Sequence, residues 1–226
     1  MPQALTACVL LLFAVQVQPE VGSGPEPSPR PISWELDFKF LDPQRIEVQL
    51  PGTTAPEVYW YMVYTVTNRS ERSQRFFPTF QLVTEDLRVV DTDMGVSMLV
   101  FDAIKERYRK THQYLVPPTK AIGELLSGDD NARESVAIWR QADLSVNEFR
   151  VYVAGLSGET RFVPNPVYDP AKPEVQVDQR TGRERVVNPK HFTLRKTLEI
   201  RYNLPGSPEE RLRAEPERVG IGWLMR

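Results

Sequence analysis

From Trp34 onward, apolar and polar residues alternate with a period of two, the pattern of a strand with one buried face and one solvated face. The alternation is clear over residues 34–40 and again over residues 46–50. Residues 42–44 separate the two runs and contain Pro43, whose fixed φ angle favours a turn. The pattern therefore predicts an antiparallel hairpin.

The next predicted strand, residues 57–67, differs because apolar side chains occupy both of its faces. The second of these faces presents Tyr59, Tyr61 and Val63. An apolar face of this kind either binds a partner, or another element of the same chain covers it. Tyr59 and Tyr61 are therefore the candidate partner-binding residues.

After Ser97 the apolar residues change to helical spacing. Val100, Ile104 and Tyr108 recur along residues 97–113, with charged residues on the other side. A second short helical turn is expected at 119–126. The apolar stripe of the first helix could cover Tyr59 and Tyr61, and this interpretation is favoured because each apolar surface needs a partner.

Further strands are predicted by alternation and by flanking turn residues, at 76–84, 88–91, 136–139, 148–156, 194–204 and 219–225. Residues 174–187 predict a mostly polar hairpin around Thr181-Gly182, which is expected to project. Residues 163–173 contain four prolines and predict an irregular loop.

About nine strands with one helix predict a mainly β protein, an antiparallel immunoglobulin-like β-sandwich. We expect one such domain over residues 33–226, with a helical insertion at about 97–127.

The amino-terminal residues 1–23 predict a signal peptide. The apolar run from Ala4 to Val17 is shorter than the roughly 20 residues of a membrane span and fits the hydrophobic region of an export signal, although no Lys or Arg precedes it. Leu5-Thr6-Ala7-Cys8 is like a lipobox, but most of the apolar run follows Cys8, which favours an ordinary export signal. Residues 24–32 predict a linker. The expected location is periplasmic or extracellular, with membrane contact only through an uncleaved amino-terminal segment.

The amino-acid composition limits the partners and the catalytic chemistry that we expect. The 226 residues are 41% hydrophobic and 26% charged, with a formal net charge of −2, values typical of a soluble globular protein. A nucleic-acid partner is not expected, because such proteins are usually strongly basic. Cys8 is the only cysteine, so the chain without its signal has no thiol for catalysis, disulfides or metal binding.

No motif predicts an enzyme, a metal site or a cofactor. His112 and His191 are isolated in the sequence and lack a zinc-binding spacing, so both are expected to be ordinary surface residues. The segment 155–159 approaches the G-x-S-x-G nucleophile motif, but Glu159 replaces the second glycine, which favours a turn.

Three polar segments are expected to be structural. The acidic segments 91–93 and 129–131 lack the spacing of a calcium loop and are interpreted as turns. Asn68-Arg69-Ser70 is a glycosylation sequon, but a hairpin loop is the simpler interpretation.

Residues 59–70 followed by 76–83 resemble the central hairpin of exported bacterial immunoglobulin-like domains, in which a strand ending in a Thr-Asn turn precedes a strand with spaced aromatics. The stretch from 128–133 to 136–139 is similar to uncharacterised members of such families. The resemblance implies an accessory or binding role and no catalytic residues.

Two functional hypotheses follow. The first is a non-catalytic exported β-sandwich, a binding or structural accessory module of the cell envelope whose partner is a protein or an envelope polymer. The alternative is a carbohydrate-active domain, either a binding module with exposed coplanar aromatics or a glycoside hydrolase with two carboxylates across a cleft. Its candidate sugar platforms are Trp34, Trp60, Trp139 and Trp223.

Overall fold

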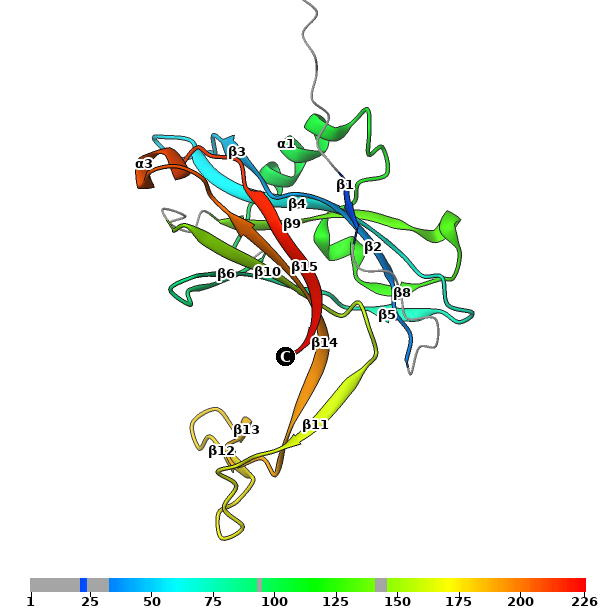
Figure 1. The fold of residues 1–226 in the computed structure, drawn as a ribbon, viewed down its shortest axis with the longest axis vertical. Coiled ribbons are helices and arrows are strands. Elements are labelled where there is room, and N and C mark those ends of the chain that lie inside the picture. Colours follow the sequence, from blue (N-terminus) through cyan, green and yellow to red (C-terminus); the bar gives the residue numbers. More distant parts are fainter. Residues whose placement is uncertain (1–20, 24–32, 93–94, 141–145) are drawn as a thin grey trace, which may run out of the picture.

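The computed structural model describes residues 21–23, 33–92, 95–140 and 146–226 (Figure 1). The described chain is mainly β, and its two larger antiparallel sheets form a sandwich with few helical residues. The predicted fold class is confirmed.

The first sheet is built around β4, which pairs with β9 along one edge and with both β2 and β3 along the other, while β1 borders β2. The strands of this sheet are β1 (Val21–Ser23), β2 (Asp37–Leu41), β3 (Gln44–Val48), β4 (Glu57–Thr67) and β9 (Arg133–Arg140). β1 occupies the last three residues of the predicted signal peptide, and residues 1–20 and the predicted linker lie outside the described residues.

The predicted hairpin over residues 34–50 is wrong, because β2 and β3 pair with β4 and not with each other. Phe40 lies opposite Tyr64 and Gln44 lies opposite Tyr61, so the three residues 41–43 face the two residues 62–63. This is a β-bulge, in which one strand gains a residue and bends. Proline is tolerated there because the ladder is already interrupted.

The second sheet has the order β7-β6-β10-β14, with β15 on the far edge of β14 and β11 paired to the first part of β14. Its strands are β6 (Thr79–Thr84), β7 (Val89–Asp91), β10 (Glu148–Ala154), β11 (Thr160–Pro164), β14 (His191–Asn203) and β15 (Glu217–Met225).

This strand order is that of an immunoglobulin-like sandwich. In chain order, the bent β2–β3 strand, β4 and β9 take the places of strands A, B and E. In the other sheet, β7, β6, β10 and β14 take the places of C′, C, F and G, and β15 adds an edge strand.

Shorter elements complete the fold. They are β5 (Gln74–Phe76) paired with β8 (Gly123–Leu125), β12 (Val175–Val177) paired with β13 (Glu184–Val186), α1 (Met98–Tyr108), α2 (Pro118–Ala121), the 3₁₀ helix η1 (Asp129–Asn131) and α3 (Pro208–Arg211). Ser97 caps the start of α1, because its hydroxyl accepts a hydrogen bond from the backbone N–H of Leu99. The insertion between β7 and β9 thus contains α1 and α2, but part of the expected second turn is the strand β8.

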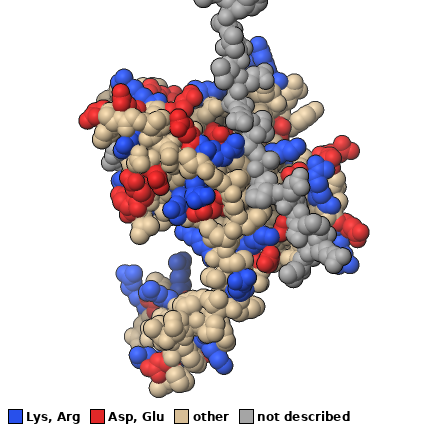
Figure 2. Space-filling model, in the orientation of Figure 1, with Lys and Arg blue, Asp and Glu red and all other residues tan. Residues whose placement is uncertain are grey.

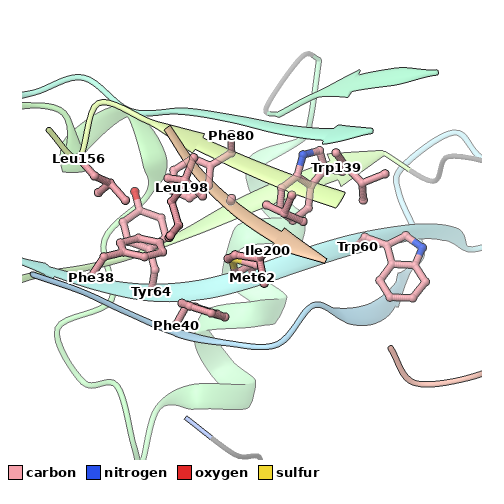
Figure 3. Close-up of a cluster of buried hydrophobic side chains, with 14 of the residues drawn as sticks. Phe38, Phe40, Trp60, Met62, Tyr64, Phe80, Trp139, Leu156, Leu198 and Ile200 are labelled. Atoms are coloured by element: carbon pink, nitrogen blue, oxygen red, sulfur yellow. The ribbon is translucent and has the colours of Figure 1, made fainter. Parts of the chain in front are cut away.

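Alternation along the strands places large apolar side chains between the two sheets (Figure 3). Met62 and Tyr64 of β4 face Phe80 of β6 and Ile200 of β14 within this core. The rings of Tyr64 and Phe80 lie 4.9 Å apart between centroids, which is within the range of favourable aromatic pairs.

A second apolar cluster lies on the outer face of β4. Tyr59 and Tyr61 are 2% and 1% exposed, and they pack in one cluster with Ile104 and Tyr108 of α1. The prediction that Tyr59 and Tyr61 bind a partner is therefore wrong, because the apolar stripe of α1 covers them. The alternative, in which the helix supplies the cover, is the one observed.

Among the described residues, no helix combines the length and the apolar character needed to cross a membrane. The apolar run from Ala4 to Val17 lies outside those residues.

The cover supplied by α1 can be tested by truncation. Ile104→Ala removes a fully buried side chain between α1 and the first sheet, and is expected to lower the free energy of unfolding by about 2–5 kcal/mol. The matched control, Leu99→Ala, truncates an exposed side chain of the same helix and should change the free energy by less than about 0.5 kcal/mol. Urea unfolding measures both; equal losses would contradict the packing.

Candidate functional site

The most unusual feature of the described chain is a projection from the sandwich, residues 160–195, which we call the arm. The arm leaves as β11, forms the β12–β13 hairpin at its tip, and returns as the first residues of β14 (Figure 1, lower part). Residues 191–195 of β14 pair with β11, whereas residues 198–203 pair with β10 in the sandwich. One continuous strand therefore belongs to both the arm and the core.

Two asparagines order the tip of the arm. The Nδ2 of Asn188 donates to the carbonyl oxygens of Asp169 (2.7 Å) and Lys172 (3.1 Å), and its Oδ1 accepts from the backbone N–H of Asp169. The Nδ2 of Asn165 donates to the carbonyl oxygen of Pro189 at 2.8 Å. Both side chains are buried, although nearly all residues around them are exposed. Hydrogen bonds of these two side chains thus order the tip, whereas an apolar core orders the sandwich.

The turn of the tip hairpin is also fixed by a side chain. Asp178 accepts hydrogen bonds from the backbone N–H groups of Arg180 and Thr181, both at 2.9 Å. These backbone donors lower the pKa of Asp178, because they stabilise its ionised form. Gly182 closes the turn at a φ of +67°, a left-handed conformation that glycine adopts without strain. The prediction of a hairpin at 174–187 is confirmed.

The tip hairpin has one apolar face that nothing in the described chain covers. Val175 lies opposite Val186, and Val177 follows two residues later on the same face. All three are exposed. In a two-stranded antiparallel unit one face is normally packed, so this face lacks the cover that the sandwich strands have.

The ribbon between tip and sandwich is apolar on both faces. Phe162 lies on one face and is 69% exposed. Val163 and Phe192 lie directly opposite each other on the other face, where Phe192 is 44% exposed. Contiguous exposed apolar surface of this kind marks an interaction site more often than it marks an inert surface.

The edges of the ribbon are open as well. Within the described residues, β11 has no second strand beside it, and residues 191–194 of β14 pair only with β11. Unpaired backbone N–H and C=O groups along such edges can accept an added strand.

The arm is positively charged. It contains seven Lys or Arg and four Asp or Glu, in a chain whose total formal charge is −2. Figure 2 shows Lys and Arg prevailing on the lower lobe, which is the tip of the arm.

A buried ion-pair cluster holds the base of the arm. The Nζ of Lys196 contacts Glu35 and lies 3.3 Å from a carboxylate oxygen of Glu159, and it lies over the ring of Trp223. Burial alone would lower the pKa of Lys196, but its hydrogen bonds to Glu35 and Glu159 outweigh this and raise the pKa above 10.5. Lys196 therefore stays charged and ties β14 to the segments before β2 and β11.

The structure does not bring the polar residues considered in the sequence into one site. His112 lies half-buried just after α1, against the ring of Tyr108, and His191 is exposed at the start of β14. Within the described ranges, no three His, Cys, Asp or Glu side chains are gathered as a metal-binding group. The segment 155–159 leads into the strand β11 and not into the helix that the nucleophile motif requires.

The two acidic segments make local contacts. Asp129 begins η1 and pairs with Arg69 at 3.0 Å. Asp91 ends β7 and accepts a hydrogen bond from Gln81 at 2.8 Å, whereas Asp93 lies outside the described residues.

The sequon residue Asn68 is fully buried. Its amide nitrogen, the atom that would bear a glycan, donates to the carbonyl oxygens of Arg72 (2.8 Å) and Leu125 (3.0 Å). The structure supports the interpretation of this sequence as a loop, because the amide is inaccessible in the folded chain.

The tryptophans are not surface platforms. Trp60 and Trp139 are buried, and Trp34 and Trp223 are half-buried against the core. The four indole rings therefore do not offer the exposed coplanar surface that a carbohydrate-binding module uses.

No family model, no curated protein and no solved structure matches this chain. The candidate site consequently depends on geometry alone.

The sequence predicted the projecting tip hairpin but missed the ribbon that carries it. Residues 165–173 are irregular, as their prolines predict, but residues 163–164 belong to β11, which pairs with β14. The sequence signal for this strand was the pair of consecutive apolar residues Phe162 and Val163. Consecutive residues of a strand lie on opposite faces, so this pair makes both faces of β11 apolar.

The asparagine bonds of the tip lead to a prediction about local stability. Asn188→Ala should lower the free energy of local opening at the tip by about 1–3 kcal/mol, because it leaves buried backbone groups unpaired. Global unfolding should be unchanged. Native-state hydrogen exchange measures both, with Gln176→Ala on the exposed polar face of the tip as the control. A parallel loss of global stability would refute a local role.

The Lys196 cluster leads to a prediction with a defined pH dependence. Lys196→Met leaves Glu35, whose side chain is 4% exposed, buried and unpaired, so the free energy of unfolding should fall by about 3 kcal/mol. Because the pKa of Lys196 is raised in the folded state, its contribution is complete below pH 10.5 and is lost as the pH rises through the raised value.

The stability difference between wild type and Lys196→Met should therefore shrink in strong alkali, where Lys196 loses its charge. Urea unfolding at several pH values provides the measurement, with Lys39→Met as a control because Lys39 is exposed in β2. A difference that stays the same in strong alkali would be inconsistent with this cluster.

Proposed function

We propose that this protein is a non-catalytic exported binding module of the cell envelope, and that the arm is its partner-recognition element. The observation that carries the proposal is the set of apolar side chains exposed on both faces of the arm, around Phe162, Phe192 and Val175. Elsewhere, the large apolar faces of the strands are covered by the opposite sheet or by α1.

A protein is the partner that this surface fits best. Open strand edges offer backbone hydrogen bonds to an added strand, and alternate side chains offer apolar contacts to it. The surplus of Lys and Arg favours an acidic partner surface, which increases the rate of association. The exposed phenyl and valyl groups would remain in water on a polysaccharide that presents mainly hydroxyl groups.

The location outside the cytoplasm is part of the same proposal. It rests on the signal-like run from Ala4 to Val17 and on the lack of any cysteine after Cys8. A domain held by apolar packing does not depend on the redox state of its compartment.

The test is a comparison of proteins captured from the native envelope fraction. The variant Phe162→Ser/Phe192→Ser should lose the proteins that wild type retains, by at least about tenfold in amount, because each buried phenyl contributes about 1.5–3 kcal/mol. Both rings are exposed in the free protein, so thermal unfolding should be unchanged.

The matched control is Phe77→Ser, which removes an exposed phenyl from the sandwich, between β5 and β6. Retention of the same proteins by Phe77→Ser and their loss from the arm variant would support the proposal. Equal capture by all three forms would rule out the arm as the recognition element.

A further inference from the structure

A cleft of about 370 Å³ lies at the other end of the sandwich from the arm, near β3 and α3 (Figure 1). Its walls are residues 42–45 at the β-bulge and the start of β3, the last turn of α1, and residues 213–216, which connect α3 to β15. The volume is within the range of small-molecule sites. Three arginines, Arg45, Arg107 and Arg213, line it.

Arg45 is held in place by the fold. Its guanidinium lies over the ring of Trp60, 5.2 Å from the ring centroid, and its Nη2 donates to the carbonyl oxygen of Ala214 at 3.3 Å. Burial lowers the pKa of Arg45, and Arg213 acts in the same direction, while Glu47 and Glu215 oppose it. The charge of an arginine is retained under these conditions, so a partly desolvated cation faces the cleft.

Arg107 is oriented by a hydrogen-bond network. Its Nη1 donates to the hydroxyl of Tyr61 at 2.8 Å and to the carbonyl oxygen of Arg45 at 3.1 Å. The hydroxyls of Tyr61 and Tyr108 both donate to the side-chain oxygen of Gln44, at 2.9 and 3.0 Å. The contacts described here use one guanidinium nitrogen of Arg107, and a guanidinium has five N–H donors.

Among the described residues, the three arginines of the cleft form no close ion pair, although Glu47 and Glu215 act on the charge of Arg45 from a longer distance. Within the described part of the chain, no Asp or Glu lies within ion-pair distance of Arg45, Arg107 or Arg213. The two acidic residues that line the cleft are Asp42 and Glu215. Asp42 accepts a hydrogen bond from Tyr202 at 2.8 Å and lies 3.5 Å from Arg218, which offsets its charge.

We propose that this cleft is a binding site for a phosphate group, in the form of a phosphate monoester or a diphosphate. The three arginines line the cleft from three different elements, β3, α1 and the segment before β15. A tetrahedral oxyanion with several charged oxygens can accept donors from several directions at once. A planar carboxylate carries less charge and has fewer oxygens, which lie in one plane, so it matches donors from several directions less well.

No residue of the arm lines the cleft, so the test of anion binding is independent of the test of partner binding.

Isothermal titration of the full chain with pyrophosphate tests the proposal. Wild type should show saturable binding at one site, weakened by added salt. Arg213→Met removes an exposed guanidinium and should weaken binding about tenfold without changing thermal unfolding. Arg45→Lys keeps the charge but loses the fork, and should also weaken binding about tenfold.

The control is Arg75→Met, which removes an equal charge from the exposed surface of β5 and should leave the affinity unchanged. Citrate at matched ionic strength distinguishes the class of anion, and weaker binding of citrate supports a phosphate site. Absence of saturable pyrophosphate binding, equal weakening by Arg75→Met, or citrate binding as tight as that of pyrophosphate would each overturn the proposal.

Discussion

The constraint on which the structure depends is that β4 is apolar on both of its faces. One face, with Met62 and Tyr64, needs the second sheet, and the other, with Tyr59 and Tyr61, needs a different cover. The helix α1 meets this need, and it comes from the insertion between β7 and β9. The protein is thus a three-layer structure over β4, and the third layer also positions Arg107 at the rim of the cleft.

The same cover explains why the two proposed sites lie where they do. The helix α1 packs against the first sheet, whereas the arm extends from the second sheet (Figure 1). The arm therefore has no helix or sheet packed against it within the described residues. Apolar burial stabilises the sandwich, whereas the tip is ordered by Asn165, Asn188 and Asp178. A unit ordered by polar bonds can keep its valines and phenylalanines exposed and still have a defined shape.

The sequence predicted the sandwich well, because strands with one buried face give a period of two and α1 gives a period near 3.6. It also favoured α1 as the cover of Tyr59 and Tyr61. The predicted hairpin turn at Pro43 was wrong. A proline after an acidic residue is equally compatible with a turn and with a bulge, and only the pairing of β2 and β3 with β4 shows which one forms. The cleft could not be predicted, since Arg45, Arg107 and Arg213 have no common periodicity and only the tertiary fold brings them together.

The continuity of β14 has a mechanical consequence. A force on the tip is transmitted along one strand from His191 into the core, where β10 and β15 flank that strand on its two sides. Because the hydrogen bonds of antiparallel neighbours run perpendicular to the strand, such a pull loads many of them together in shear instead of opening them one by one. The ion pairs of Lys196 lie at the point where the load enters the sandwich. The shared strand therefore resists a pull on the tip through many hydrogen bonds at once.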